Sequence, residues 1–109
     1  MKKEKLKLLF VCSFGQQRSP TAEKIYKKEY NTKSAGIYSQ EHPVTRELLN
    51  WADQILVMEK EHQIDIIKNF PEYDHKITVL NIPDMYNYNN PELIKLLKEK
   101  VKETLNINK

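Results

Sequence analysis

The stretch VCSFGQQRSP, residues 11–20, holds the only cysteine of the chain, followed after five intervening residues by Arg18 and Ser19. A loop between a strand and a helix can turn several backbone N–H groups toward one point, and the helix N-terminus adds partial positive charge. Such a loop binds a phosphate-like dianion and favours thiolate over thiol. The spacing therefore predicts a nucleophilic Cys12, with Arg18 forked onto two phosphate oxygens and Ser19 donating a hydrogen bond to the sulfur.

The interior of this loop is the predicted phosphate-binding segment. Gly15 stands in its middle, where glycine easily adopts a positive φ. A motif of cysteine, any five residues, arginine and then serine or threonine occurs by chance in about one chain in a hundred of this length. A lone cysteine is also often a small buried hydrophobic residue. The strand expected before the loop and the helix expected after it favour the functional interpretation. The residues predicted to contact phosphate are Ser13, Phe14, Gly15, Gln16, Gln17 and Arg18.

Periodic apolar residues predict the elements that must hold this loop. Strands are expected at 6–11, 33–35, 55–58 and 77–80. Helices are expected from a Ser19 cap with Pro20 in the first helical position to about residue 30, and at 44–52, 62–70 and 91–105, with a turn-rich loop at 81–90. This alternation predicts an α/β fold, a four-stranded parallel sheet flanked by helices on both faces. The carboxyl ends of the strands then bring Cys12, Met58 and the loop after Leu80 to one edge.

The composition limits which classes of protein the chain can belong to. A length of 109 residues fits one domain, residues 1–109, and 39% hydrophobic with 30% charged residues is typical of a soluble globular chain. The net charge of +3 is spread along the sequence, which argues against a nucleic-acid partner. One cysteine excludes an internal disulfide and a cysteine-only metal cage. Since the apolar run near the start is too short for a signal peptide or a membrane helix, we expect a cytoplasmic protein. The sequence does not indicate an oligomeric state, and a monomer is the default expectation.

Four segments together resemble a known family. LLFVCSFGQQRSPTAEKIY, KSAGI, WADQILVMEKEH and NIPDMYNY occur in this order and span most of the chain. They resemble the low-molecular-weight protein tyrosine phosphatases, and in particular a short prokaryotic branch of them. The resemblance implies hydrolysis of a phosphate monoester through a cysteinyl-phosphate intermediate, with no metal or other cofactor. The substrate it implies is a phosphorylated protein or a small phosphate ester.

The resemblance also assigns roles beyond the loop. Asp84 matches the family's general acid, which protonates the leaving oxygen and then deprotonates the attacking water. Tyr86 and Tyr88 match aromatic residues that wall the substrate cleft, with packing within the loop as the alternative. His42 and His62 have no paired ligands in the sequence and are interpreted as surface residues. His75 has a possible partner in Asp74, but it precedes the fourth strand, at the sheet edge opposite the site, and no functional role is assigned to it.

This chain also departs from the family pattern. Gly15 stands where the family has an asparagine that braces the loop, and Gln17 stands where many members have a second cysteine. Gln16 occupies a position that tunes leaving-group choice, and it matches neither the aliphatic residue that accompanies phosphotyrosine nor the threonine that accompanies phosphoarginine. The stretch 37–50 is much shorter than in the longer members, which removes a loop that walls their cleft.

Two further functions stay open at the sequence level. A phosphate-binding module that no longer turns over fits the shortened wall and Gly15. A phosphocysteine carrier also places a cysteine after a first strand, but it needs neither Arg18 nor Asp84. Arsenate reduction is disfavoured, because the chain has no further cysteine to resolve the intermediate.

Overall fold

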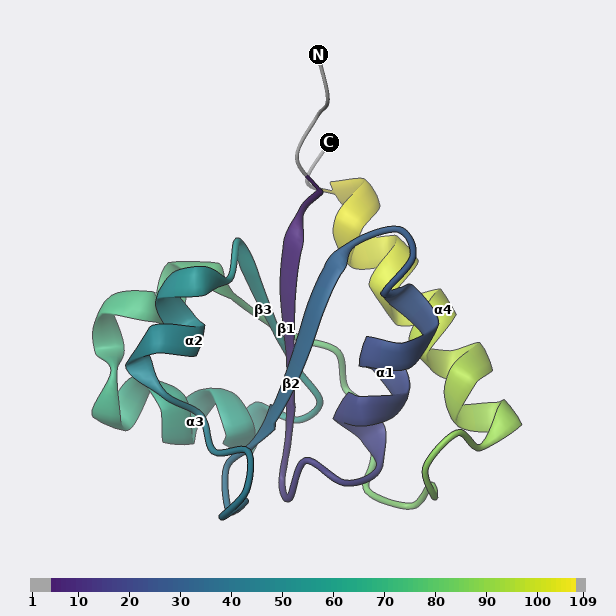
Figure 1. Cartoon of the computed structure of the whole chain (residues 1–109), viewed down its shortest axis with the longest axis horizontal. Helices are drawn as coiled ribbons and strands as arrows, with labels where there is room; N and C mark the ends of the chain where they lie inside the picture. The colour runs from purple at the N-terminus through teal and green to yellow at the C-terminus, as the bar shows by residue number, and fades with distance from the viewer. Residues whose placement is uncertain (1–4, 108–109) are drawn as a thin grey trace.

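A single parallel sheet organises the computed structural model, which describes residues 5–107. Its strands are β1 (Lys7–Cys12), β2 (Asn31–Gly36), β3 (Gln54–Val57) and β4 (Ile77–Val79), in the order β2-β1-β3-β4 (Figure 1). All three strand pairs are parallel. The predicted four-stranded parallel sheet is thus confirmed, and β1 lies inside it with neighbours on both sides.

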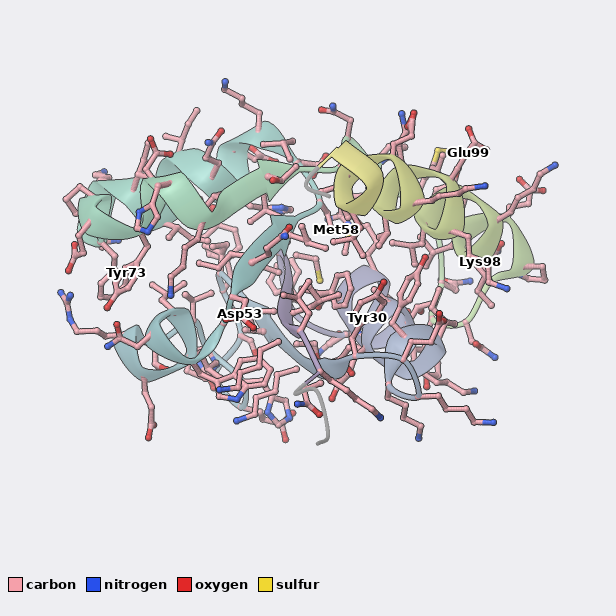
Figure 2. The ribbon with its side chains drawn as sticks, turned by 90° about the horizontal axis from the view of Figure 1, so that it is seen from above. Tyr30, Asp53, Met58, Tyr73, Lys98 and Glu99 are labelled. Carbon is pink, nitrogen blue, oxygen red and sulfur yellow. The ribbon has the colours of Figure 1, made fainter. Side chains whose placement is uncertain are left out.

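Helices cover both faces of the sheet, also as predicted. Figure 1 shows α1 (Arg18–Tyr26) and α4 (Pro91–Ile107) on one face, and α2 (Arg46–Trp51) and α3 (Lys60–Asn69) on the other. In the view from above, Met58 lies between these two layers, while Lys98 and Glu99 lie on the outer side of α4 (Figure 2). Among the helices of the described residues, none has the length and apolar character needed to cross a membrane.

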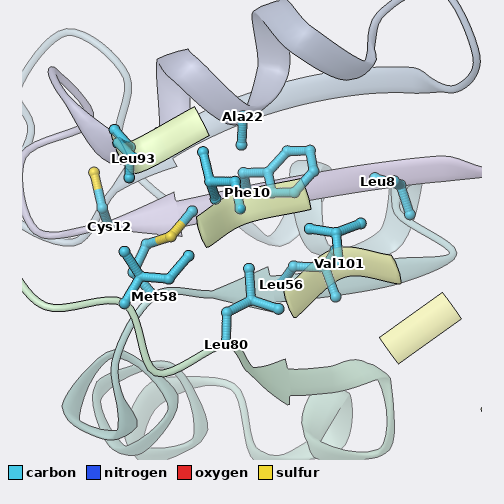
Figure 3. Packing of buried hydrophobic residues seen from close by; sticks show 11 residues of the cluster. Leu8, Phe10, Cys12, Ala22, Leu56, Met58, Leu80, Leu93 and Val101 are labelled. Atoms are coloured by element: carbon cyan, nitrogen blue, oxygen red, sulfur yellow. The ribbon is translucent and has the colours of Figure 1, made fainter. Parts of the chain in front are cut away.

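The strand β1 supplies the centre of two separate hydrophobic clusters. Leu8 and Phe10 face α1 and α4, whereas Leu9 and Val11 face α2 and α3. Alternate side chains of a strand point to opposite faces, so a strand covered on both sides is apolar at every position. This explains the unbroken run LLFVC, and Figure 3 shows Cys12 at the end of one cluster, near Met58 and Leu93.

The long helix α4 is held by one apolar stripe. Leu93, Leu97 and Val101 recur every four residues and are fully buried in the cluster around Phe10. Burial of each such side chain contributes about 1.5–3 kcal/mol. The stripe therefore fixes α4, and with it the end of the 81–90 loop that α4 follows.

Several boundaries differ from the sequence-based expectation. The helix α1 begins at Arg18 with Gln17 at the N-cap, so Ser19 is not the capping residue. It ends at Tyr26 rather than near residue 30, and the chain enters β2 two residues earlier than predicted. A short 3₁₀ helix, η1 (Pro71–Lys76), fills a segment for which no element was expected. The reason for the Ser19 error is that its hydroxyl serves another partner, described below.

Candidate active site

The predicted nucleophile Cys12 is the last residue of β1 and is only 2% exposed. Its Sγ accepts a hydrogen bond from the backbone N–H of Gly15, with N and Sγ 3.2 Å apart. The Oγ of Ser19 lies 3.1 Å from the same sulfur. The loop therefore closes around the sulfur, with the Gly15 N–H donating to it and the Ser19 hydroxyl in contact with it.

The hydroxyl of Ser19 can serve both charge states of Cys12. Ser19 is fully buried, and its Oγ lies 3.2 Å from the carbonyl oxygen of Ala35, to which it donates. When Cys12 is a thiol, its S–H can donate to Ser19 while Ser19 donates to Ala35. When Cys12 is a thiolate, the Ser19 hydroxyl can turn and donate to the sulfur. Ser19 thus contacts the sulfur and does not cap the helix, and its stabilising role toward the sulfur stays a prediction.

Arg18 is buried, with 1% of its surface exposed, and its guanidinium is held from several directions. Its Nη1 donates to the carbonyl oxygen of Ile82 at 2.7 Å and lies 3.2 Å from Oε1 of Glu59. Its Nη2 lies 3.4 Å from Oγ of Ser13 and 3.7 Å from Oδ1 of Asp84. A buried charge is costly unless it is paired, so these partners fix the position of the guanidinium at the floor of the site.

Glu59 is a site residue that the sequence analysis missed. It follows Met58 directly after β3, at the same sheet edge as Cys12, and it forms the ion pair with Arg18. An acidic residue immediately after a buried strand, on the edge where the arginine was expected, was a usable indication of this partner. The pair holds Nη1 of Arg18, while Nη2 is directed toward Ser13 and Asp84.

Two glycines allow the phosphate loop to lie against β2. Gly15 has a φ of 68°, in the left-handed region that favours glycine. Gly36, at the end of β2, packs so closely that a Cβ there would lie 2.4 Å from the backbone N of Gly15 and 2.4 Å from the backbone C of Phe14. No side chain fits at residue 36 without displacing the loop, which explains the glycine of the KSAGI segment.

A cavity of about 220 Å³ opens above the sulfur. It gathers most of the residues that the sequence predicted for the site, including Asp84, whose side chain is 60% exposed at the rim. Tyr86 and Tyr88 do not line it. The lining residues are Cys12, Ser13, Phe14, Gln16, Gln17, Arg18 and Asp84.

The 81–90 loop is fastened to the start of α1. The side-chain oxygen of Gln17 accepts a hydrogen bond from the backbone N–H of Tyr88. The hydroxyl of Thr21 accepts one from the backbone N–H of Asn89 at 2.8 Å and donates to the carbonyl of Gln17 at 2.7 Å. These contacts bring Asp84 within reach of Arg18, so Gln17, which replaces the family's second cysteine, has a structural use of its own.

The two predicted wall residues lie away from the mouth of the cavity. Tyr86 is half-buried against the hydrophobic cluster that contains Phe10, which matches the packing alternative. Tyr88 is exposed, with the Nζ of Lys24 5.8 Å from its ring centroid. Their role toward a substrate stays a prediction.

A different aromatic pair stands beside the cavity. Phe14 of the phosphate loop and Tyr38, just after β2, are 55% and 62% exposed, with ring centroids 5.7 Å apart. Tyr38 is held there by its backbone N–H, which donates to the carbonyl of Ser13 at 2.7 Å. The short 37–50 stretch thus still provides an aromatic surface, which sequence reasoning did not find because the contact links residues 24 positions apart.

The interpretation of His62 as a surface residue is wrong. This histidine, on the first turn of α3, is 1% exposed. Its Nδ1 accepts a hydrogen bond from the backbone N–H of Glu59 at 3.0 Å, and its Nε2 lies 3.0 Å from Oγ of Ser13. Burial and the nearby Arg18 charge lower its pKa below the ordinary histidine value, against opposing contributions from Glu59, Asp65 and Asp84. His62 was misjudged because both of its partners come from other segments or from the backbone.

One group of potential metal ligands lies next to the site. Within the described residues, Glu59, Glu61 and His62 place ligand atoms within 4.8 Å of one another. Glu59 is paired with Arg18, however, and both ring nitrogens of His62 are engaged with Glu59 and Ser13. A metal ion here would have to displace the contacts that hold Arg18 and the phosphate loop.

Comparison with solved structures places this architecture among known proteins. The tyrosine phosphatase Wzb from Escherichia coli K30, solved with phosphate, is 21% identical and matches with a TM-score of 0.75 over 92% of this chain and 96% of its own. The YwlE arginine phosphatase from Geobacillus stearothermophilus is 22% identical, with a TM-score of 0.72 over 94% of each chain.

A low-molecular-weight protein tyrosine phosphatase from T. tengcongensis is 24% identical, with a TM-score of 0.70 over 91% of this chain and 99% of its own. No family model and no curated protein matches the sequence. The agreement with these solved structures extends over more than nine-tenths of the chain. The chain therefore has the fold of the low-molecular-weight protein tyrosine phosphatases, as its sequence motifs predicted.

Proposed function

We propose that this protein is a cysteine-dependent phosphomonoesterase that acts on aryl phosphates, with phosphotyrosine in a protein as the favoured substrate. One observation carries the proposal: a single cavity is lined by Cys12, Arg18 and Asp84. These three side chains supply a nucleophile, an anion clamp and a proton donor, and Asp84 comes from a segment far in the sequence from the loop that carries Cys12 and Arg18. Such convergence favours catalysis over an isolated buried cysteine.

In the first step, the Cys12 thiolate attacks the phosphorus atom while Arg18 binds two of the phosphoryl oxygens. The P–S bond forms as the bond from phosphorus to the leaving oxygen breaks. Asp84, protonated, gives its proton to that oxygen, and the alcohol or phenol departs. The backbone N–H groups of the loop and the N-terminus of α1 stabilise the negative charge that spreads over the phosphoryl oxygens.

In the second step, the Asp84 carboxylate takes a proton from a water molecule, whose oxygen attacks phosphorus. The P–S bond breaks, inorganic phosphate leaves, and the thiolate is restored. The Ser19 hydroxyl, 3.1 Å from the sulfur, stabilises the departing thiolate by a hydrogen bond.

The aromatic pair Phe14–Tyr38 supports an aryl substrate. The two rings are exposed beside the cavity, where the ring of a phosphotyrosine could stack on them. Solved proteins with this fold are named as tyrosine phosphatases and as arginine phosphatases, so phosphoarginine is the principal competing substrate. Gln16 lines the same cavity but matches neither the residue that accompanies phosphotyrosine nor the one that accompanies phosphoarginine, so it does not decide between the two substrates.

The proposal includes a reducing compartment, the cytoplasm, because a thiolate nucleophile must stay reduced. It also treats the protein as a functional monomer, since the nucleophile, the anion clamp and the proton donor of one chain already line a common cavity.

Hydrolysis of 4-nitrophenyl phosphate, a phosphotyrosine peptide and a phosphoarginine peptide between acidic and neutral pH tests the proposal. We expect turnover of both aryl phosphates by the wild type, and none by Cys12→Ser of the same folded structure. Mass spectrometry after acid quench should detect phosphate on Cys12. A folded wild type that hydrolyses none of the three contradicts an active phosphatase.

A phosphate-binding module without turnover is the second candidate, favoured by the exposure of Asp84. It predicts that orthovanadate or phosphate raises the melting temperature while hydrolysis is absent. The absence of any thermal shift with either anion would remove this candidate too.

A further inference from the structure

Ser13 lines the cavity, and two other side chains contact its hydroxyl oxygen. Nη2 of Arg18 lies 3.4 Å from its Oγ, and Nε2 of His62 lies 3.0 Å from it. Arginine can only donate, so Arg18 uses one acceptor site of the Ser13 oxygen. Whether Ser13 donates or accepts toward His62 depends on which ring nitrogen carries the proton.

The backbone decides the tautomer of His62. The N–H of Glu59 points at Nδ1 of the ring, 3.0 Å away, and a backbone N–H can only donate. Nδ1 must therefore present its lone pair, so in the neutral ring the proton resides on Nε2. Nε2–H then donates to Ser13, whose oxygen accepts from both His62 and Arg18.

Both acceptor positions of Ser13 are thus occupied by contacts within the described residues, and its own O–H proton is left to donate. A hydrogen-bond acceptor on a bound ligand would lie in the cavity that Ser13 and Cys12 both line. A phosphoryl oxygen is a strong acceptor of such a hydrogen bond.

We propose that His62, neutral with its proton on Nε2, is a positioning residue that sets the Ser13 hydroxyl as a hydrogen-bond donor to the phosphoryl group. This inference rests on the proposed function, and it adds a specific donor to the backbone N–H groups of the loop. His62 does not touch the substrate; it acts through Ser13, and it ties the start of α3 to the phosphate loop.

The charges around His62 give the arrangement a pH dependence. Arg18 and burial disfavour the cationic ring, while Glu59, Asp65 and Asp84 favour it, with the net effect of lowering its pKa below 6.5. A protonated ring would carry a hydrogen on Nδ1 opposite the N–H of Glu59, and the contact would break. As the pH falls below 6.5, the unfolded chain binds a proton that the folded chain resists, so the free energy of unfolding decreases toward the lowered pKa.

A double-mutant cycle tests the coupling, with Ser13→Ala, His62→Phe and the pair, each checked for folding by its melting temperature. We expect each single variant to lower kcat/KM for 4-nitrophenyl phosphate by about tenfold, the size of one hydrogen bond, and the pair to lose little more. His62→Gln, which keeps a neutral N–H donor near the Nε2 position, should recover most of the activity. Because glutamine does not titrate, this variant should also lack the decrease in stability and activity at acidic pH that protonation of His62 causes.

The same four proteins, titrated with tungstate by calorimetry, separate this inference from the proposed function. If the wild type binds tungstate but hydrolyses no substrate, the proposed phosphatase activity is wrong. The coupling between Ser13 and His62 is then judged from the tungstate affinities of the four proteins, for which we expect the same non-additive losses. NMR of the ¹⁵N-labelled imidazole should show the proton on Nε2 at neutral pH. Additive losses in the cycle, full activity of His62→Phe, or a proton on Nδ1 would each overturn the proposal.

Discussion

The two halves of the candidate site are built in opposite ways. The phosphate loop, residues 12–19, is buried at its key positions, and it is braced by β2, by the start of α3 and by the carbonyl of Ile82. The 81–90 loop carries Asp84 and Met85 with 60% and 71% of their surface exposed. Ile82, near the start of this loop, is buried in the core and its N–H donates to the carbonyl of Met58, whereas beyond it the loop is attached chiefly by hydrogen bonds to Gln17 and Thr21.

This difference separates anion binding from proton transfer. A loop fixed by packing and paired charges is ready to bind a phosphoryl group without rearrangement. A loop held by few contacts can move as substrate enters and product leaves. We therefore expect substitutions at the buried positions of the phosphate loop to lower stability and activity together, and substitutions at exposed positions of the 81–90 loop or at its attachment to Gln17 to lower activity alone.

The largest effect is expected for Arg18→Ala. It removes the anion clamp and leaves Glu59 without its partner, so activity should fall by a factor on the order of 10⁴. The free energy of unfolding should fall by about 2–3 kcal/mol, below the range for a fully buried pair because Glu59 is 28% exposed. Urea unfolding and steady-state kinetics measure both. The control is Arg46→Ala, which breaks an exposed ion pair with Glu72. An equal loss of stability in this variant would contradict the special role of the buried Arg18.

Gly36→Ala should have the next largest effect. The new Cβ would meet backbone atoms of Phe14 and Gly15 at 2.4 Å, so the loop must shift. We expect a loss of about 2–3 kcal/mol in stability and about a hundredfold in activity. Thermal unfolding with and without tungstate checks this, because a distorted loop should also lose the stabilisation by the anion. Unchanged tungstate binding would mean that the loop tolerates the Cβ.

Asp84→Asn should lower kcat by about a hundredfold, since the amide cannot protonate the leaving oxygen. Its exposure predicts a change of at most about 0.5 kcal/mol in stability. Comparing 4-nitrophenyl phosphate with phenyl phosphate is the sharper measurement, because the poorer leaving group needs the acid more. Equal losses for both substrates would argue that Asp84 is not the proton donor.

The smallest effect is expected for Gln17→Ala. Losing the hydrogen bond to the N–H of Tyr88 frees one attachment of the 81–90 loop, and kcat should fall by about threefold. The melting temperature should hardly change. The matched control is Gln63→Ala on α3, which removes an exposed hydrogen bond to Asp74 of η1. A large loss of stability for Gln17→Ala would show that the attachment matters for folding rather than for the position of Asp84.

Much of this site was predictable from one short stretch of sequence. The positions of Cys12, Arg18 and Ser19 followed from a strand, a loop and a helix, because their chemistry is local. Asp84 was predicted through the family resemblance, and the structure brings it to the same cavity. Glu59, Tyr38 and the burial of His62 were not predicted, since each depends on a contact with a segment distant in sequence.

The sequence by itself determined the sheet, the helices and the place of the phosphate loop, because hydrophobic periodicity and the strand-to-helix turn are properties of neighbouring residues. The tertiary structure alone decided which groups hold that loop in place. Glu59 orients Arg18, Gly36 admits the backbone of Phe14, and His62 reaches Ser13 across 49 residues. Side-chain type fixes which partners a residue can bind, but only the packing of distant segments brings those partners within hydrogen-bonding distance.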